Sequence, residues 1–185
     1  MTVARGIGSI LLSVLGIVVF LSAVVLGFKI LGSNAPINPI ISDTIDLRNA
    51  EDPVRKAQLI TELDDLVQQA ENEDVSEQWN RMTSCLATSC PDEAYFDMIL
   101  VTVAVYENKI PQSALLINLI ATNKYWGDPE QVIEFSKAMS TADEQVNELD
   151  SRNAAKIWSE IVACNAVCPE RNNLFFDLIN VIVRH

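Results

Sequence analysis

The sequence predicts an all-α protein in which one N-terminal transmembrane helix is followed by a helical bundle, or a short solenoid, made of two related three-helix halves. Three observations lead to this prediction. An apolar segment of membrane-spanning length lies near the N-terminus, apolar residues recur at helical spacing beyond it, and a pattern of tryptophan, cysteines, proline and Phe-Asp occurs twice. No stretch shows the sustained alternation of apolar and polar residues that is typical of a strand.

The first element is the apolar segment. Between residues 7 and 31 the only charged residue is Lys29. Residues 10–28 are long enough to cross the roughly 30 Å hydrocarbon layer as a helix of about 20 residues. A cleaved signal peptide has a shorter apolar region and a small-residue cleavage site, which Ser33-Asn34-Ala35 matches poorly. Residues 1–31 are therefore predicted to be an uncleaved transmembrane anchor.

The charges that flank this segment predict its orientation. Arg5 and the amino terminus precede it, whereas beyond Lys29 the next basic residue is Arg48. The positive-inside rule thus favours a single-pass protein with a cytoplasmic N-terminus and a periplasmic or extracellular C-terminal domain. The four cysteines also suit an oxidising compartment.

Small residues form a seam along one stripe of the predicted span, at steps that alternate between three and four. Lipid tails are as apolar as leucine, so membrane helices associate largely through close packing at small residues. We therefore expect this stripe to pack against the transmembrane helices of other subunits. The seam consists of Gly6, Ser9, Ser13, Gly16, Ala23 and Gly27, with Phe20 completing the series.

Residues 32–51 are predicted to be a linker, because Gly32, Pro36 and Pro39 oppose a continuing helix. An acidic, all-helical domain then fills residues 52–185. Within it, a pattern that begins at Trp79 and includes Cys85, Cys90-Pro91 and Phe96-Asp97 returns in the same order and at nearly the same spacing. The later copy consists of Trp158, Cys164, Cys168-Pro169 and Phe176-Asp177. We interpret this repeat as a duplication.

Each half is predicted to contain three helices. In the first half, 52–109, they cover 53–70, about 75–87, and a stretch that begins at 91. A buried linking helix is expected within 110–127, ended by Gly127. In the second half, 128–185, the helices are expected at 129–139, about 142–167 with a possible break at 150–151, and 169–183. Asp52-Pro53 and Asp128-Pro129 have the form of an N-cap followed by proline, and Thr141 with Glu144 that of a capping box.

The cysteines occupy equivalent corners between helices. Proline follows the second cysteine in both copies and can open a new helix there. We predict two local disulfides, Cys85–Cys90 and Cys164–Cys168. A metal site that uses all four thiolates, or a thiol-exchange centre, stays open as an alternative.

Two acidic residues, Asp97 and Asp177, repeat inside apolar runs. A buried carboxylate needs a hydrogen-bonding partner. The simplest candidates are the indoles of the same half, so Trp79 is predicted to pair with Asp97 and Trp158 with Asp177.

Charge and composition limit the functions that the chain can have. Beyond the anchor, eleven basic residues face 25 acidic ones, a formal charge of −14, which argues against nucleic acid as a ligand. The acidic surface is expected either to keep the domain soluble or to dock a basic protein partner. The only histidine is His185, and no glycine-rich phosphate loop is present. No catalytic residues, metal or cofactor are therefore predicted.

The function predicted from the sequence is that of a non-catalytic accessory or scaffold subunit of a membrane protein complex. Its span would contact partner helices and membrane lipid, and its disulfide-stapled domain would add a docking surface. Two alternatives belong to other classes. One is a redox or metal-binding module that uses the four cysteines, and the other is a free-standing, membrane-anchored module that binds a peptide or ligand.

Overall fold

The computed structural model describes residues 37–164 and 168–184, which fold into helices without a strand in these ranges. The predicted anchor, residues 1–31, lies outside the described residues, and so does its seam of small residues. None of the helices within the described ranges combines the length and apolarity needed to cross a membrane. The elements are α2 (Ile37–Asn49), α3 (Pro53–Ala70), α4 (Glu73–Leu86), α5 (Asp92–Val105), the 3-10 helix η1 (Glu107–Lys109), α6 (Ser113–Tyr125), α7 (Val132–Glu148), α8 (Arg152–Ala163) and α9 (Arg171–Arg184).

Local sequence signals explain where several helices begin and end. Asp52 caps α3 by accepting hydrogen bonds from the backbone N–H groups of Val54 and Arg55, and Pro53 opens that helix as predicted. Asn72 and Ser151 cap α4 and α8 in the same way. These caps satisfy amide groups that have no partner within the helix. Gly127, with a φ of 79°, follows α6 as expected of a C-terminal glycine.

The predicted linker at residues 32–51 is corrected by the structure, because residues 37–49 form helix α2. Pro39 lies in the first turn of α2, where the missing N–H costs nothing since that group would have no partner within the helix. The apolar face of α2, which includes Ile40, Ile41 and Ile45, is fully buried. The prolines do oppose a helix that continues from upstream, but they permit a new one.

Each half therefore contains four helices rather than three, since α6 repeats α2. The buried positions Ile40, Ile41, Thr44 and Ile45 of α2 recur in α6 with the same spacing. They correspond there to Leu115, Leu116, Leu119 and Ile120. The predicted linking helix, 110–127, is thus the first helix of the second half. Its repeat is hard to see in the sequence because the identities of the buried residues changed.

Helices α7 and α8 repeat α3 and α4 at a constant offset, the one that also relates Trp79 to Trp158. The buried Leu63 and Val67 correspond to Ala142 and Val146, and both N-caps follow the same register. The predicted boundary near residue 140 is wrong, because α7 is continuous there and the Thr141 hydroxyl donates to the Lys137 carbonyl within it. The break expected at 150–151 is confirmed, since α7 ends at Glu148 and α8 begins at Arg152.

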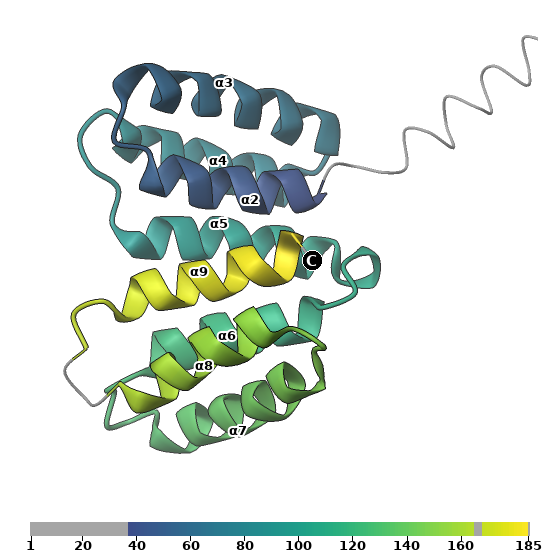
Figure 1. Cartoon of the computed structure of the whole chain (residues 1–185). Helices are drawn as coiled ribbons and strands as arrows, with labels where there is room; N and C mark the ends of the chain where they lie inside the picture. Colours follow the sequence, from purple (N-terminus) through teal and green to yellow (C-terminus); the bar gives the residue numbers. More distant parts are fainter. Residues whose placement is uncertain (1–36, 165–167, 185) are drawn as a thin grey trace, which may run out of the picture. The chain divides into compact units, whose positions relative to one another are not determined.

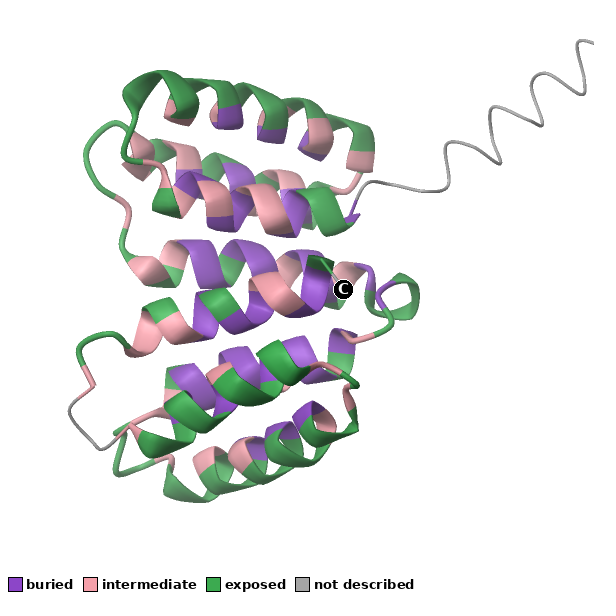
Figure 2. Ribbon diagram, in the orientation of Figure 1, coloured by how far each residue is buried: buried purple, intermediate pink, exposed green. Residues whose placement is uncertain are grey.

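The helices form a stack with related halves on either side of its centre (Figure 1). Helices α2, α5, α6 and α9 make up a central quartet, in which α2 and α6 each contact both α5 and α9. The hairpin α3–α4 covers one side of the quartet and α7–α8 covers the other. Buried residues concentrate on the quartet, while the outer faces of α3 and α7 are mostly exposed (Figure 2). The quartet is the shared core of both halves.

A pair of equivalent phenylalanines lies where the halves meet. Phe96 of α5 and Phe176 of α9 stack with their ring centroids 4.0 Å apart, and both are buried. The guanidinium of Arg48 lies over the Phe176 ring, 4.3 Å from its centroid. Stacked rings contribute about 0.5–1.5 kcal/mol beyond the area they bury. This contact joins the two copies through the same residue of each.

The two ends of the stack differ in what they carry. Helix α2 begins and α9 finishes on the same side of the stack, at one end of the long axes of the helices (Figure 1). The end of α4 and the start of α5, and likewise the end of α8 and the start of α9, lie at the opposite end. Ile37, the first residue that the structure describes, is therefore remote from the disulfides.

Replacement of Phe96 by alanine tests the central contact. We expect Phe96→Ala to lower the free energy of unfolding by about 3–5 kcal/mol, because a buried ring is replaced by a cavity. The double variant Phe96→Ala/Phe176→Ala should lose less than the sum of the two single losses, since the rings contact one another. Equilibrium denaturation with intact disulfides measures both quantities. The exposed neighbour Asp97→Ala serves as the control, and strictly additive losses would contradict the role given to the stack.

Candidate functional site

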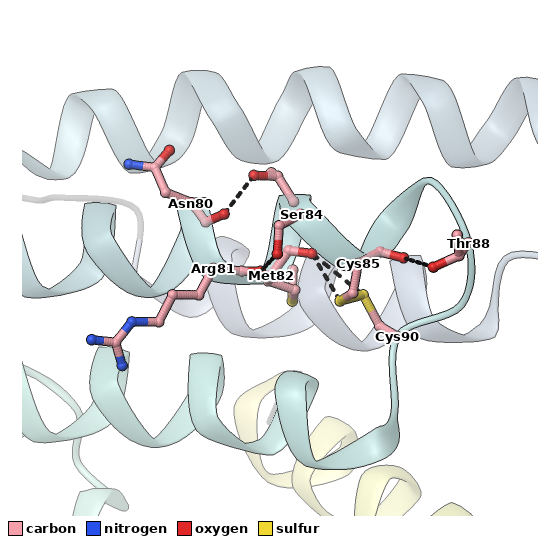
Figure 3. The surroundings of a disulfide bond; sticks show 8 residues. Asn80, Arg81, Met82, Ser84, Cys85, Thr88 and Cys90 are labelled. Carbon is pink, nitrogen blue, oxygen red and sulfur yellow. Dashed lines mark hydrogen bonds between the residues drawn. A yellow bond between two sulfur atoms is a disulfide. The ribbon is translucent and has the colours of Figure 1, made fainter.

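The four cysteines form two disulfides, Cys85–Cys90 and Cys164–Cys168, as predicted. Figure 3 shows the first bond at the point where the chain leaves α4 and turns toward α5. The Cα atoms of the two residues are 4.9 Å apart, and the Thr88 hydroxyl donates to the Cys85 carbonyl within the turn. The second bond closes the equivalent corner between α8 and α9. Both thiol pairs are thus committed to fixing helix corners.

Each tryptophan donates its indole N–H to a carboxylate, but the acceptors differ from those predicted. Trp79 Nε1 donates to Asp64 Oδ1 over 2.9 Å, and Trp158 Nε1 donates to Asp143 Oδ1 over 2.7 Å. The bonds join α3 to α4 and α7 to α8, and the donor lies 15 residues after the acceptor in both. The same bond therefore holds together the outer hairpin of each half.

The predicted pairs of Trp79 with Asp97 and of Trp158 with Asp177 are wrong, because both of these aspartates are exposed. On α5 the residues on either side of Asp97, Phe96 and Met98, take the buried positions. The correct acceptors did leave a signal in the sequence. The step from Asp64 to Asp143 equals the step from one tryptophan to the other, but adjacent acids made both aspartates resemble ordinary surface charges.

A surface pocket of about 630 Å³ lies at the end that carries the disulfides, between the α2–α3 turn, the α4–α5 corner and α9. Its most connected residue is Arg48, which sequence reasoning missed. Arg48 donates to both carboxylate oxygens of Asp92, over 2.7 and 3.0 Å, and to the side chains of Asn49 and Asn173. Asn172 donates to the same Asp92 carboxylate. This network links α2, α5 and α9 beneath the pocket.

The electrostatics of this network favour the ionised form of Asp92. The hydrogen bond from Arg48 holds the pKa of Asp92 below its ordinary value of 3.8, against the opposing effect of burial. The bidentate geometry matches the fork of a guanidinium to a carboxylate. Because each nitrogen of the Arg48 side chain already donates a hydrogen bond, the residue serves to connect helices.

The equivalent place in the second half is apolar. There a pocket of about 400 Å³ is lined by Trp126, Val132 and Phe135 in addition to turn residues. Phe135 stands where the first half has Lys56, which lines the polar pocket. The Trp126 ring packs edge-on against Phe135 and Phe175, and Arg171 lies over its face. The two copies have thus diverged in the chemistry of the same turn.

A third depression, of about 320 Å³, lies between α4 and α5. It has an apolar floor from α5 and a charged wall from α4. The floor consists of Val101, Ala104 and Val105, and the wall of Asp74, Glu77, Gln78 and Arg81.

The described residues contain no group of three or more histidine, cysteine, aspartate or glutamate side chains that could hold a metal ion. The seam residues predicted to pack in a membrane, Gly6 to Gly27, lie outside the part of the chain that the structure describes. Comparisons of the chain with protein-family models, with curated proteins and with solved structures find no match.

The bond between Trp79 and Asp64 can be tested by a double-mutant cycle. We expect Asp64→Ala to lower the free energy of unfolding by about 1–2 kcal/mol, because a hydrogen bond to a charged acceptor is lost at a partly exposed site. Trp79→Phe removes the donor, so the double variant should show clear coupling. Chemical denaturation gives all four values. Asp65→Ala is the matched control, and no coupling between Trp79 and Asp64 would refute the pairing.

The Arg48–Asp92 pair predicts a dependence of stability on pH. A depressed pKa in the folded state means that the contribution is complete above the unfolded value of 3.8 and is lost as the pH falls through the folded pKa. Asp92→Asn should therefore cost about 1–2 kcal/mol near neutral pH and progressively less below about pH 4. Burial raises the pKa of Asp43, which acts with the opposite sign, but Asp43 is present in both proteins. A difference between them that stays constant down to pH 2 would contradict the prediction.

Proposed function

We propose that the chain is a non-catalytic accessory or scaffold subunit of a membrane protein complex. In this proposal residues 1–31 cross the membrane with the N-terminus in the cytoplasm, and the small-residue seam packs on helices of other subunits. The helical domain then lies on the periplasmic or extracellular side, where it docks a basic protein partner. Two disulfides suit such an oxidising compartment.

The observation that carries the docking role is an acidic run without a basic residue in the first of two equivalent hairpins, whose total charges are similar, −4 for residues 53–86 and −3 for residues 132–165. Residues 57–80, in α3 and α4, contain seven acidic residues and no basic one. Residues 136–159, the equivalent stretch in α7 and α8, contain four acidic and three basic residues. Six of the seven acidic side chains in the first hairpin are exposed. Because the folds of both hairpins are alike, the acidity of the first is not needed for folding, and it suits contact with a basic surface.

The internal bonds of the polar groups favour a structural rather than a catalytic role. Arg48 and Asp92 connect helices, Asp64 and Asp143 accept from indoles, and the cysteines staple corners. These engagements weigh against the redox or metal-binding alternative, which requires free thiols. The module that binds a ligand between its halves is the second candidate, and the open polar pocket near Arg48 is the observation in its favour.

The seam tests the membrane part of the proposal. Ser13→Leu/Gly16→Leu keeps the segment apolar enough to insert but prevents close approach of a partner helix. We expect normal abundance of this variant in the membrane fraction, together with loss of the proteins that co-purify with the wild type. Affinity purification followed by mass spectrometry measures both.

Leu12→Ile and Val19→Leu, on another face of the segment, are the control and should leave association intact. Full co-purification of the double-leucine variant would remove the seam as a packing surface. A wild-type chain that purifies alone would instead favour the free-standing binding module.

A further inference from the structure

The groove between α4 and α5 differs from its counterpart in the second half. On α5, Ala104 is exposed and Val101 and Val105 are half-buried, so an apolar strip reaches the surface. Helix α5 carries apolar residues on nearly all of its faces after the first turn, which an ordinary surface helix does not. The packing of α5 within the central quartet uses most of these apolar residues, whereas Val101, Ala104 and Val105 line an open groove.

The position equivalent to Ala104 carries a charged residue in the second copy. Arg184 of α9 stands at the position of Ala104, and it contacts both carboxylate oxygens of Asp46 in α2 over 2.8 and 2.9 Å. The positions that correspond to this α9–α2 pair are both alanine, Ala104 of α5 and Ala121 of α6. The salt bridge therefore has no counterpart between α5 and α6, and Ala104 lines the groove of about 320 Å³.

The wall of the groove has diverged in charge as well. Asp74 and Glu77 of α4 correspond to Asn153 and Lys156 of α8. Glu77 is paired with Arg81, whereas Asp74 stands beside the exposed acids Glu71 and Glu73 at the start of α4. The acidic residues at the start of α4 thus border an apolar floor, whereas the corresponding wall on α8 carries the ion pair of Lys156 with Glu160.

We propose that this groove is a docking site for an amphipathic helix of a partner protein, whose apolar side chains enter the groove and whose flanking residues are basic. The inference rests on the proposed docking function and names its site. The stretch from Asp74 to Arg81 covers two helical turns, about 10 Å, which matches one or two anchor side chains at i and i+3 or i+4. The basic flanks follow from the acidic rim, since like charges across an interface are unfavourable.

The test uses the full chain in nanodiscs of zwitterionic lipid. The probe is a 14-residue helical peptide with leucine along one face, lysine along the other, and a photoreactive benzophenone at its central apolar position. Fluorescence anisotropy, corrected for empty nanodiscs, measures binding, and mass spectrometry maps the cross-linked residues. We expect adducts in 74–81 or 98–109. A peptide of the same composition in scrambled order, and one with glutamate in place of lysine, should bind at least tenfold more weakly.

Matched substitutions separate the groove from general charge attraction. Ala104→Arg introduces the residue of the second half and should weaken binding at least tenfold, with the fold retained because arginine suits an exposed helical position. Ala155→Arg makes the same change at an exposed position of α8 and should alter binding less than twofold. Asp74→Lys should weaken binding about fivefold, and Glu144→Lys, on α7, should not.

The outcomes are distinct. Adducts in the groove that disappear in Ala104→Arg support the proposal. No binding, adducts spread over the acidic surface, or equal losses in Ala104→Arg and Ala155→Arg would overturn it. Light scattering that shows a dimer broken by Ala104→Arg would replace the partner helix by a second copy of this chain. Each of these results is independent of the co-purification that tests the proposed function.

Discussion

The contact between α5 and α9 is the constraint on which the rest of the domain depends. Phe96 and Phe176 stack at the junction. Arg48 lies over the Phe176 ring and donates a hydrogen bond to Asp92 on α5. Helices α2 and α6 pack against both of these helices, so this contact lies at the centre of the quartet. The outer hairpins then have a fixed core to cover, and each adds its own indole-to-carboxylate bond.

Duplication explains how the surface could diverge without loss of the fold. Buried positions match at a constant offset through α3–α4 and α7–α8, so the internal packing of both hairpins follows one plan. The exposed positions carry no such constraint, and they differ in charge and polarity. The turn near Arg48 is polar while its counterpart at Trp126 is aromatic, and Ala104 at the α4–α5 groove stands where the second copy has Arg184, which pairs with Asp46 of α2. The two copies therefore share their core and differ at their surface.

Much of the fold and part of the site could be predicted from the sequence. Helical spacing, caps such as Asp52 and Gly127, and the two Cys…Cys-Pro corners identified most helices and both disulfides, because these signals act over a few residues. Helix α2 was missed because Pro36 and Pro39 resemble a linker until the position of Pro39 within the first turn is known. Helix α6 was predicted as a linking helix, but its place in the repeat was missed, since α2 and α6 share a burial pattern but few identical residues.

The sequence by itself determined the helical class, the repeat and the disulfide partners, since all of these follow from residue types and short spacings. Only the tertiary structure decided which carboxylate accepts the hydrogen bond of each indole. Asp64 on α3 and Asp97 on α5 are both near Trp79 in sequence. Neighbouring residues of a helix point about 100° apart, so a difference of one position decides whether a side chain reaches the indole, as that of Asp64 does, or is exposed, as that of Asp97 is. The tertiary structure also decided that Arg48, Asp92 and Asn173 contact one another. Asp92 lies 44 positions and Asn173 lies 125 positions after Arg48, so the three side chains come together only because their helices share one core.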